Sequence, residues 1–276
     1  MNKEISNKII NYAKNNESIE AIYYLEDNSY DSFIHIYTIV NEVIVGKMED
    51  ELVQIFDDVI LLNRQKDEFS FEKDNYNYTS LNIYTANNLK LTESIISEDF
   101  VDAFIKSVPE KIKVLYSKPG FYKLEVSNDF SYQKPKEYEV MSTIKNFFAT
   151  AYETSLFIDE KDPIAASLKL EDVRKYLTNM VDFYVKNKYA YKLSMGDDGQ
   201  NLTNTLEYDI KENYLLTFSH DDLMDIYFSL FKACVLFRRL AMEICKDLGY
   251  AYPKEIDVET LKVLRKNYKK LESFIN

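Results

Sequence analysis

The chain has 276 residues, with 34 lysines and arginines against 46 aspartates and glutamates and a formal net charge of −12. This length suits one large domain or two modest ones. The hydrophobic content of 46%, with 23 tyrosines and 17 phenylalanines, supplies material for a packed core and excludes a disordered chain.

Glycine is scarce. The five glycines are Gly46, Gly120, Gly196, Gly199 and Gly249. No window contains the glycine patterns of dinucleotide-binding folds or P-loops, so these phosphate cradles are excluded. The nitrogen and sulfur ligands are His35, His220, Cys234 and Cys245. This set is too small to predict a structural zinc site.

The acidic balance argues against nucleic acid as a partner, because nucleic-acid binding needs a basic surface. It is compatible with a cationic partner, or simply with solubility. No apolar run approaches the ~20 residues of a membrane span, and the amino terminus lacks the apolar stretch of a signal peptide. We therefore expect a cytoplasmic protein that does not enter a membrane.

In the first half, hydrophobic periodicity predicts an amphipathic helix followed by a β-rich stretch with two further helices. The expected helices are residues 5–14, 48–56 and 92–106. The expected strands are residues 20–25, 33–40, 59–62, 68–72, 78–85 and 113–116, with 68–72 and 78–85 forming a hairpin-like pair.

The second half reads as helical. The expected helices are residues 138–157, 170–185, 219–248 and 258–274. The third is the best defined, because Ser219 and Asp222 form a capping-box-like start and Gly249 is a stop signal. Cys234 and Cys245 fall on nearly one side of it and are expected to be small buried residues. We place the domain boundary between residues 134 and 135.

The end of the long helix carries a recognisable pattern. Residues 233–238 read Ala-Cys-Val-Leu-Phe-Arg and residues 248–253 read Leu-Gly-Tyr-Ala-Tyr-Pro. They resemble the last long helix of the aminoglycoside 6-adenylyltransferases, also called streptomycin adenylyltransferases. Weaker matches follow the same order at residues 113–120, 134–148 and 180–184.

The resemblance implies an α+β fold: a nucleotidyltransferase-type mixed sheet flanked by helices over 1–134, then an all-α helical bundle over 135–276. In that family, ATP, Mg²⁺ and the antibiotic meet in a cleft, and AMP is transferred to an aminoglycoside hydroxyl. The family holds Mg²⁺ with an Asp-x-Asp pair on one strand and a further Asp on a neighbouring strand. A Gly-Ser pair on the preceding turn approaches the phosphates.

The residues at these positions differ here. The two strand positions fall on Phe33 and His35, and the last falls on Asn82, on a strand expected to neighbour the first. No Gly-Ser pair occurs anywhere in the chain. Mg²⁺ prefers carboxylate oxygens, so we expect no metal ligand at these degenerate positions and no ATP or Mg²⁺ as cofactor.

Other residues leave alternatives open. His35 can act as a metal ligand or base, or as a hydrogen-bonded strand histidine without a chemical role. A register slip of two residues would place Asp31 at a metal position. Glu26 and Asp27 are further replacements, although turn carboxylates are usually solvated. His220, in the first turn of a helix, is expected to belong to a capped helix start.

In the helical half, the family's proton-accepting acid before a proline aligns with the run Asp-Glu-Lys-Asp-Pro at residues 159–163. Glu160 and Asp162 are therefore candidate substrate-binding residues, or simply an acidic corner between helices. The family's Gly-Lys pair aligns with Gly196 and Asp197, which places negative charge where a phosphate-pairing cation is expected.

Together these features predict a catalytically inactive member of the nucleotidyltransferase superfamily. It would bind a cationic small molecule such as an aminoglycoside, or a protein partner. The alternative is an active adenylyltransferase with an unorthodox metal site. The sequence does not indicate an oligomeric state.

Overall fold

The computed structural model describes residues 3–25, 30–43, 45–56, 58–71, 74–107, 112–121, 131–196, 199–218 and 222–275. The chain divides into two compact units, residues 1–130 and residues 131–276. Each is described by itself below.

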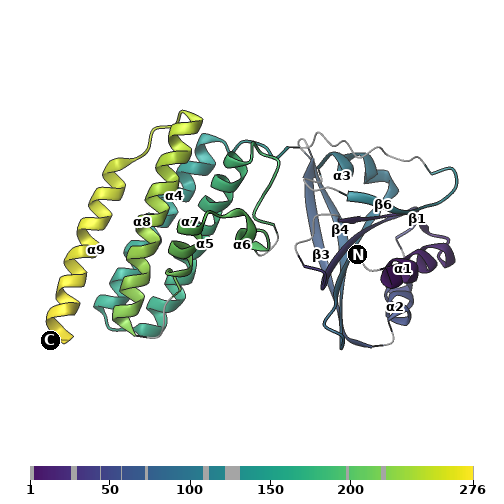
Figure 1. Cartoon of the computed structure of the whole chain (residues 1–276), viewed down its shortest axis with the longest axis horizontal. Helices are drawn as coiled ribbons and strands as arrows, with labels where there is room; N and C mark the ends of the chain where they lie inside the picture. Colours follow the sequence, from purple (N-terminus) through teal and green to yellow (C-terminus); the bar gives the residue numbers. More distant parts are fainter. Residues whose placement is uncertain are drawn as a thin grey trace. The chain divides into compact units, whose positions relative to one another are not determined.

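The first unit contains a six-stranded sheet with helices (Figure 1). Its helices are α1 (Lys3–Asn15), α2 (Val45–Ile55), the 3₁₀ turn η1 (Glu98–Phe100) and α3 (Val101–Ser107). Its strands are β1 (Ile19–Leu25), β2 (Phe33–Val40), β3 (Val59–Phe71), β4 (Asp74–Thr85), β5 (Lys90–Ser97) and β6 (Ile112–Ser117). The strand order is β3-β4-β5-β2-β1-β6. Only the β2–β5 pair is parallel among these neighbours, so the sheet is mixed as predicted.

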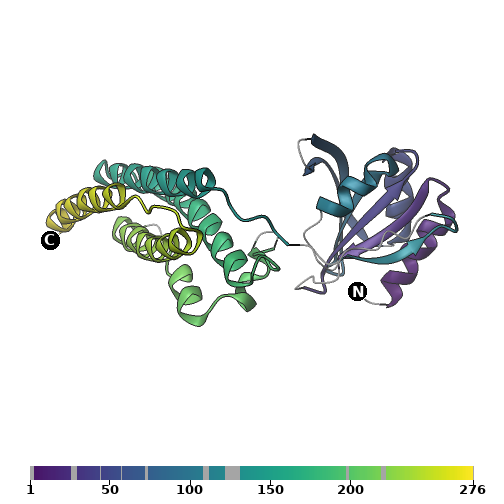
Figure 2. The same cartoon turned by 90° about the horizontal axis from the view of Figure 1, so that it is seen from above.

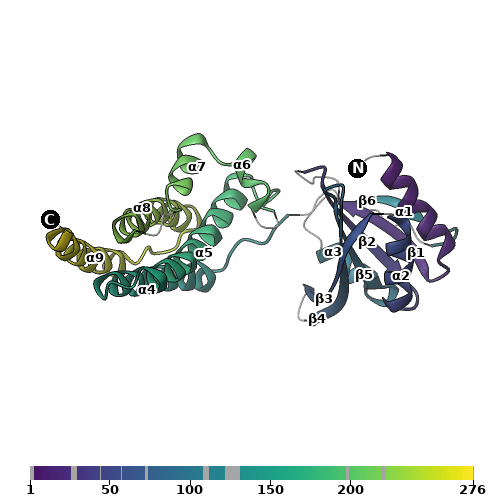
Figure 3. The ribbon, with the colours of Figure 1, turned by 90° about the horizontal axis from the view of Figure 1, so that it is seen from below.

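The two faces of the sheet are covered by different helices, as Figure 3 shows. One face packs under α1 and α2, and its core includes Ile36, Leu81 and Leu91. The other face packs under α3 through Phe104, against residues such as Ile39 and Ile96. Because successive strand residues point to opposite faces, each strand contributes to both cores.

The expected helix over residues 92–106 is wrong in its first part. Residues 90–97 form strand β5, and the helix α3 starts only at Val101. Leu91, Glu93 and Ile95 alternate with residues on the other face, and all three are buried. Both faces of a central strand are covered, so apolar residues on both sides imitate a helical spacing.

Strand β3 is also longer than expected. Residues 59–71 form one 13-residue strand where two short strands were expected. It pairs with β4 from end to end. Several polar side chains in its middle, Asn63 to Lys66, are exposed. Their polarity hid the strand, because a strand on the sheet edge needs few apolar residues.

The second unit is a helical bundle (Figures 1 and 2). Its helices are α4 (Glu137–Asp159), α5 (Pro163–Lys188), α6 (Leu202–Thr205), α7 (Tyr208–Leu215), α8 (Leu223–Leu248) and α9 (Lys254–Ile275). Helices α4 and α5 form an antiparallel hairpin. Helix α8 packs on α5, and α9 packs on α4. Helices α4, α5 and α9 extend beyond their expected ends, whereas α8 starts at Leu223 with Asp222 as its N-cap, and not at residue 219 as expected. Ser219 lies outside the described residues. Helices α6 and α7 were not expected.

Helix α8 shows how local signals fix helix ends. Asp222 is its N-cap, and its carboxylate accepts hydrogen bonds from the backbone N–H groups of Met224 and Asp225. Gly249 ends it in the left-handed conformation with φ 76°. Cys234 and Cys245 are both buried and free, as expected. No helix in the described ranges is long and apolar enough to cross a membrane.

Candidate functional site

A row of polar side chains crosses the sheet on the face that carries α3. His35 on β2 is paired with Thr92 on β5, and Thr92 is paired with Asn82 on β4. Side chains in register on neighbouring strands project to the same face. His35, Thr92 and Asn82 therefore form one lateral row, which we call the His35 row.

Hydrogen bonds link this row outward. The Thr92 hydroxyl donates to Asn82 Oδ1 at 2.8 Å, and Asn82 Nδ2 donates to Gln65 Oε1 on β3 at 3.0 Å. The Asn82 side chain is buried. It is held on both sides, so its orientation is fixed by its neighbours.

The His35 side chain is hydrogen-bonded to a serine hydroxyl, which contacts a second one. Its Nε2 lies 2.9 Å from Ser94 Oγ, which lies 3.2 Å from Ser80 Oγ. Burial, reinforced by the positive charge of Lys90, lowers the pKa of His35 to about 4, and the opposing effect of Asp67 is smaller. The ring is therefore neutral near pH 7. These contacts agree with one of the two interpretations of His35 from the sequence, namely a hydrogen-bonded strand histidine without a chemical role.

The structure corrects the expected strand neighbours. Asn82 does not lie on a strand next to β2, because β5 lies between them. The residue directly beside His35 is Thr92, which was missed because residues 92–106 were expected to be helical. The β-branched residues Thr92, Ile95 and Ile96 were the signal that could have revealed the strand.

Phe33 starts strand β2 and is 40% exposed. It is paired with Lys90 at the start of β5, and the Lys90 Nζ lies 5.9 Å from its ring centroid. This arrangement allows a cation–π contact. Phe33 therefore shares a strand and a face with His35 but brings no oxygen or nitrogen atom to it.

Glu93 is the carboxylate nearest in sequence to Thr92, and it faces away. It lies fully buried in the core under α1 and α2. Its carboxylate accepts hydrogen bonds from the Thr38 hydroxyl at 2.6 Å and the Tyr12 hydroxyl at 3.4 Å. Burial raises its pKa to about 7, although these hydrogen bonds act in the opposite direction.

The atoms of the His35 row do not fit Mg²⁺. The row offers a neutral imidazole, a hydroxyl and a carboxamide, whereas Mg²⁺ selects carboxylate oxygens in octahedral geometry. Within the described ranges, no group of three or more His, Cys, Asp or Glu residues could hold a metal ion.

The alternative carboxylates lie elsewhere. Asp31 is exposed in the turn before β2. It lines a hollow with Glu4, Lys8 and Asp58, among others. Glu26 and Asp27 lie outside the described residues, as do His220 and Asp197.

Glu160 and Asp162 lie at the turn between α4 and α5 in the second unit. Asp162 is the N-cap of α5, and its Oδ1 accepts a hydrogen bond from the Ala165 N–H at 3.0 Å. Glu160 is the C-cap residue of α4 and is exposed. Asp162 therefore has a structural role as a helix cap, and among the described residues Glu160 has no hydrogen bond of this kind from its side chain to the start of α5.

Comparisons with known proteins agree with this architecture. The sequence model described as streptomycin adenylyltransferase matches residues 1–266. The chain belongs to this family.

Two curated proteins are similar to this chain over most of the length of both sequences. One is an aminoglycoside 6-adenylyltransferase of Bacillus subtilis (strain 168), 23% identical over 218 residues, or 78% of this chain and 77% of the relative. The other is an aminoglycoside 6-adenylyltransferase of Campylobacter jejuni, 20% identical over 263 residues, or 91% of this chain and 90% of the relative.

A solved structure supports the fold. The crystal structure of an aminoglycoside 6-adenyltransferase from Bacillus subtilis matches with a TM-score of 0.51 and 21% identity, covering 97% of this chain and 99% of that one. At this identity the likeness concerns the fold. The chain therefore has the nucleotidyltransferase fold expected from its sequence.

Proposed function

We propose that this adenylyltransferase-family chain does not transfer AMP and instead binds a cationic small molecule of the aminoglycoside class. The observation that carries the proposal is that Phe33, His35 and Asn82, the residues that the family resemblance aligns with the metal carboxylates, carry no carboxylate group. Core packing and site chemistry use different residues, so a fold can persist after its site has changed.

Neutral groups weaken a nucleotidyl-transfer site for a simple reason. Metal ions contribute several kcal/mol by neutralising the charge that develops on transferred phosphoryl groups. Each 1.36 kcal/mol corresponds to about tenfold in rate. Loss of the carboxylates that hold the ions therefore costs about a thousandfold or more. Glu93 offers no rescue, because its carboxylate is buried on the opposite face.

A cationic ligand is supported by the charge of the chain and by its relatives. The net charge is −12, and both curated relatives are named for action on aminoglycosides, which are compounds rich in amines. The exposed carboxylates of Glu160 and Asp162 are the proposed contacts. Asp162 uses Oδ1 for the helix cap, and its second oxygen is the proposed contact for a ligand amine.

Calorimetry with streptomycin, other aminoglycosides and spermine tests the binding proposal. Wild type should bind one of these compounds, and the double variant Glu160→Gln/Asp162→Asn should bind at least tenfold more weakly. Asparagine preserves the α5 cap. The matched control is Glu212→Gln/Asp225→Asn, at exposed acids on other helices, which should bind as wild type does. Absence of heat at millimolar ligand contradicts the cationic-ligand proposal and would favour a protein partner as the ligand of an inactive chain.

An active adenylyltransferase is the second candidate, favoured by the family match over residues 1–266. It would use Asp31, Glu26, Asp27 or His35 in place of the usual ligands. An assay with radiolabelled ATP, an aminoglycoside panel, and Mg²⁺ or Mn²⁺ distinguishes the two candidates. We expect no labelled antibiotic. Transfer that is abolished by Asp31→Asn or His35→Ala would establish the second candidate.

A further inference from the structure

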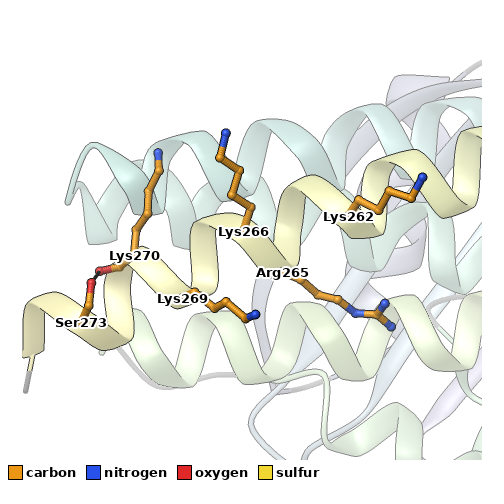
Figure 4. A pocket seen from close by; sticks show the side chains of 6 residues that line it. All are labelled: Lys262, Arg265, Lys266, Lys269, Lys270 and Ser273. Atoms are coloured by element: carbon orange, nitrogen blue, oxygen red, sulfur yellow. Dashed lines mark hydrogen bonds between the residues drawn. The ribbon is translucent and has the colours of Figure 1, made fainter.

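The outer face of α9 carries a stripe of cations, which stands out on an acidic chain. Figure 4 shows its side chains along the helix. They line an open hollow of about 520 Å³: Lys262, Arg265, Lys266, Lys269, Lys270 and Ser273. With 1.5 Å of rise per residue, the five cations span ~12 Å of helix. We call this surface the α9 stripe.

The stripe results from the amphipathic pattern of α9. Leu261, Leu264 and Leu271 are buried in the bundle core, and the Asn267 amide donates to Ser155 Oγ on α4 at 3.3 Å. Residues three and four apart share a helix face. With the apolar side fixed against the bundle, the cations point to the outside of the unit.

Two of the cations are paired and three are not. Lys270 Nζ lies 3.0 Å from the Asp159 carboxylate, and Lys262 is paired with Glu259 on its own helix. Within the described residues, Arg265, Lys266 and Lys269 have no hydrogen bond or ion pair to a carboxylate. All three are exposed. The middle of the stripe thus carries unneutralised positive charge.

We propose that the α9 stripe is a docking surface for a short acidic segment of a protein partner. Charge complementarity specifies an anion. The carboxylates of Glu259 and Asp159 lie at the two ends of the stripe, so an acidic segment of two helical turns fits between them. A long phosphate backbone would run past both carboxylates and over a chain of net charge −12, whereas nucleic-acid binding needs an extended basic surface.

Fluorescence anisotropy with a labelled decaglutamate peptide tests the proposal, with a labelled single-stranded RNA decamer as the competing probe. The test variant is Arg265→Gln/Lys266→Gln/Lys269→Gln. The control is Lys145→Gln/Lys175→Gln/Lys246→Gln, which removes the same charge from exposed sites on other helices. Circular dichroism verifies that both variants keep the helical fold.

Wild type and control should bind decaglutamate with similar affinity at 50 mM salt, and the test variant should bind about tenfold more weakly, as expected for the loss of three exposed ion pairs. Equal weakening in both variants would show an effect of net charge alone and overturn the proposal. RNA binding tighter than peptide binding would overturn the acidic-protein assignment. Absence of peptide binding by wild type would overturn the docking surface itself.

Discussion

His35 and Thr92 face each other across the parallel strands β2 and β5. Thr92 is in turn hydrogen-bonded to Asn82 on the next strand. The neighbour of His35 on the next strand is thus a hydroxyl group hydrogen-bonded to an amide, and not a carboxylate. Thr92 and Asn82 are hydrogen-bonded to each other, and His35 and Asn82 have further partners in Ser94 and Gln65. These hydrogen bonds stabilise the sheet without requiring an ion.

This network predicts an asymmetry between two asparagines on β4. Asn82→Ala removes the acceptor of Thr92 and the donor to Gln65 from a buried position, so it should lower the free energy of unfolding by about 1–2 kcal/mol. Asn77→Ala, at an exposed position of the same strand, should change it little. Urea unfolding of both variants measures the difference, and equal effects would show that the network contributes nothing.

Glu93 predicts a pH dependence of stability. Its pKa is about 7 in the folded chain and ordinary, about 4.3, when unfolded, so the folded state binds its proton more tightly. The stabilisation of the folded state by the proton on Glu93 is fully present below about pH 4.3 and is lost as the pH rises through about 7. At pH 8 the raised pKa of Glu93 lowers the free energy of unfolding by about 4 kcal/mol relative to pH 4.

Glu93→Gln isolates this effect, because glutamine does not ionise and can still accept the Thr38 hydrogen bond. The difference in unfolding free energy between wild type and Glu93→Gln should shift in favour of the variant between pH 5 and pH 8. Urea titrations at several pH values measure it. A difference that stays constant over this range would show that the carboxylate does not titrate as described.

The ion pairs of the bundle should differ in importance. Arg238 holds Asp257 with two hydrogen bonds, one of them from Nε at 2.6 Å, and the Asp257 side chain is only 5% exposed. Asp257→Asn should lower the free energy of unfolding by about 2 kcal/mol, because the Arg238 guanidinium would lose its carboxylate partner. The neighbouring Arg239–Asp209 pair is exposed on both sides, so Asp209→Asn should have no measurable effect. Thermal unfolding compares the two; a larger effect at Asp209 would contradict this ranking.

Two glycines should respond oppositely to alanine. Gly249 has φ 76°, and a Cβ there would meet nothing within 4 Å, so Gly249→Ala should cost about 1 kcal/mol through backbone strain alone. Gly46 lies in α2 without a positive φ and with equal space. Gly46→Ala should therefore stabilise by about 0.5 kcal/mol. Changes of the same sign in calorimetric melting temperature would refute the conformational explanation.

The sequence predicted the helices well and the sheet less well, for a physical reason. Helix α8 ends at Gly249 because local groups complete its last turn, and local groups can be recognised along the chain. Strand β5 forms because it pairs with β2 and β4, which are distant in sequence. Its buried Glu93 also breaks the apolar pattern, and its hydrogen-bond partners could not be known in advance.

The sequence placed some residues of the candidate site on the correct strand and missed others. Phe33 and His35 were placed on the right strand because β2 has a clear apolar pattern. Thr92 was missed with β5. Asn82 was assigned to a strand beside β2, but β5 lies between the two strands, so Thr92 separates Asn82 from His35. The side of the sheet faced by Glu93 followed from the register, which the sequence does not encode locally.

The binding of Mn²⁺ in the presence of ATP tests the central claim most directly, because Mn²⁺ is visible by electron paramagnetic resonance and suits oxygen ligands as Mg²⁺ does. With equimolar ATP and chain, we predict that the chain adds no Mn²⁺ site beyond that of free ATP up to millimolar metal. About one additional Mn²⁺ per chain, lost in His35→Ala or Asp31→Asn, would contradict a site without metal ligands.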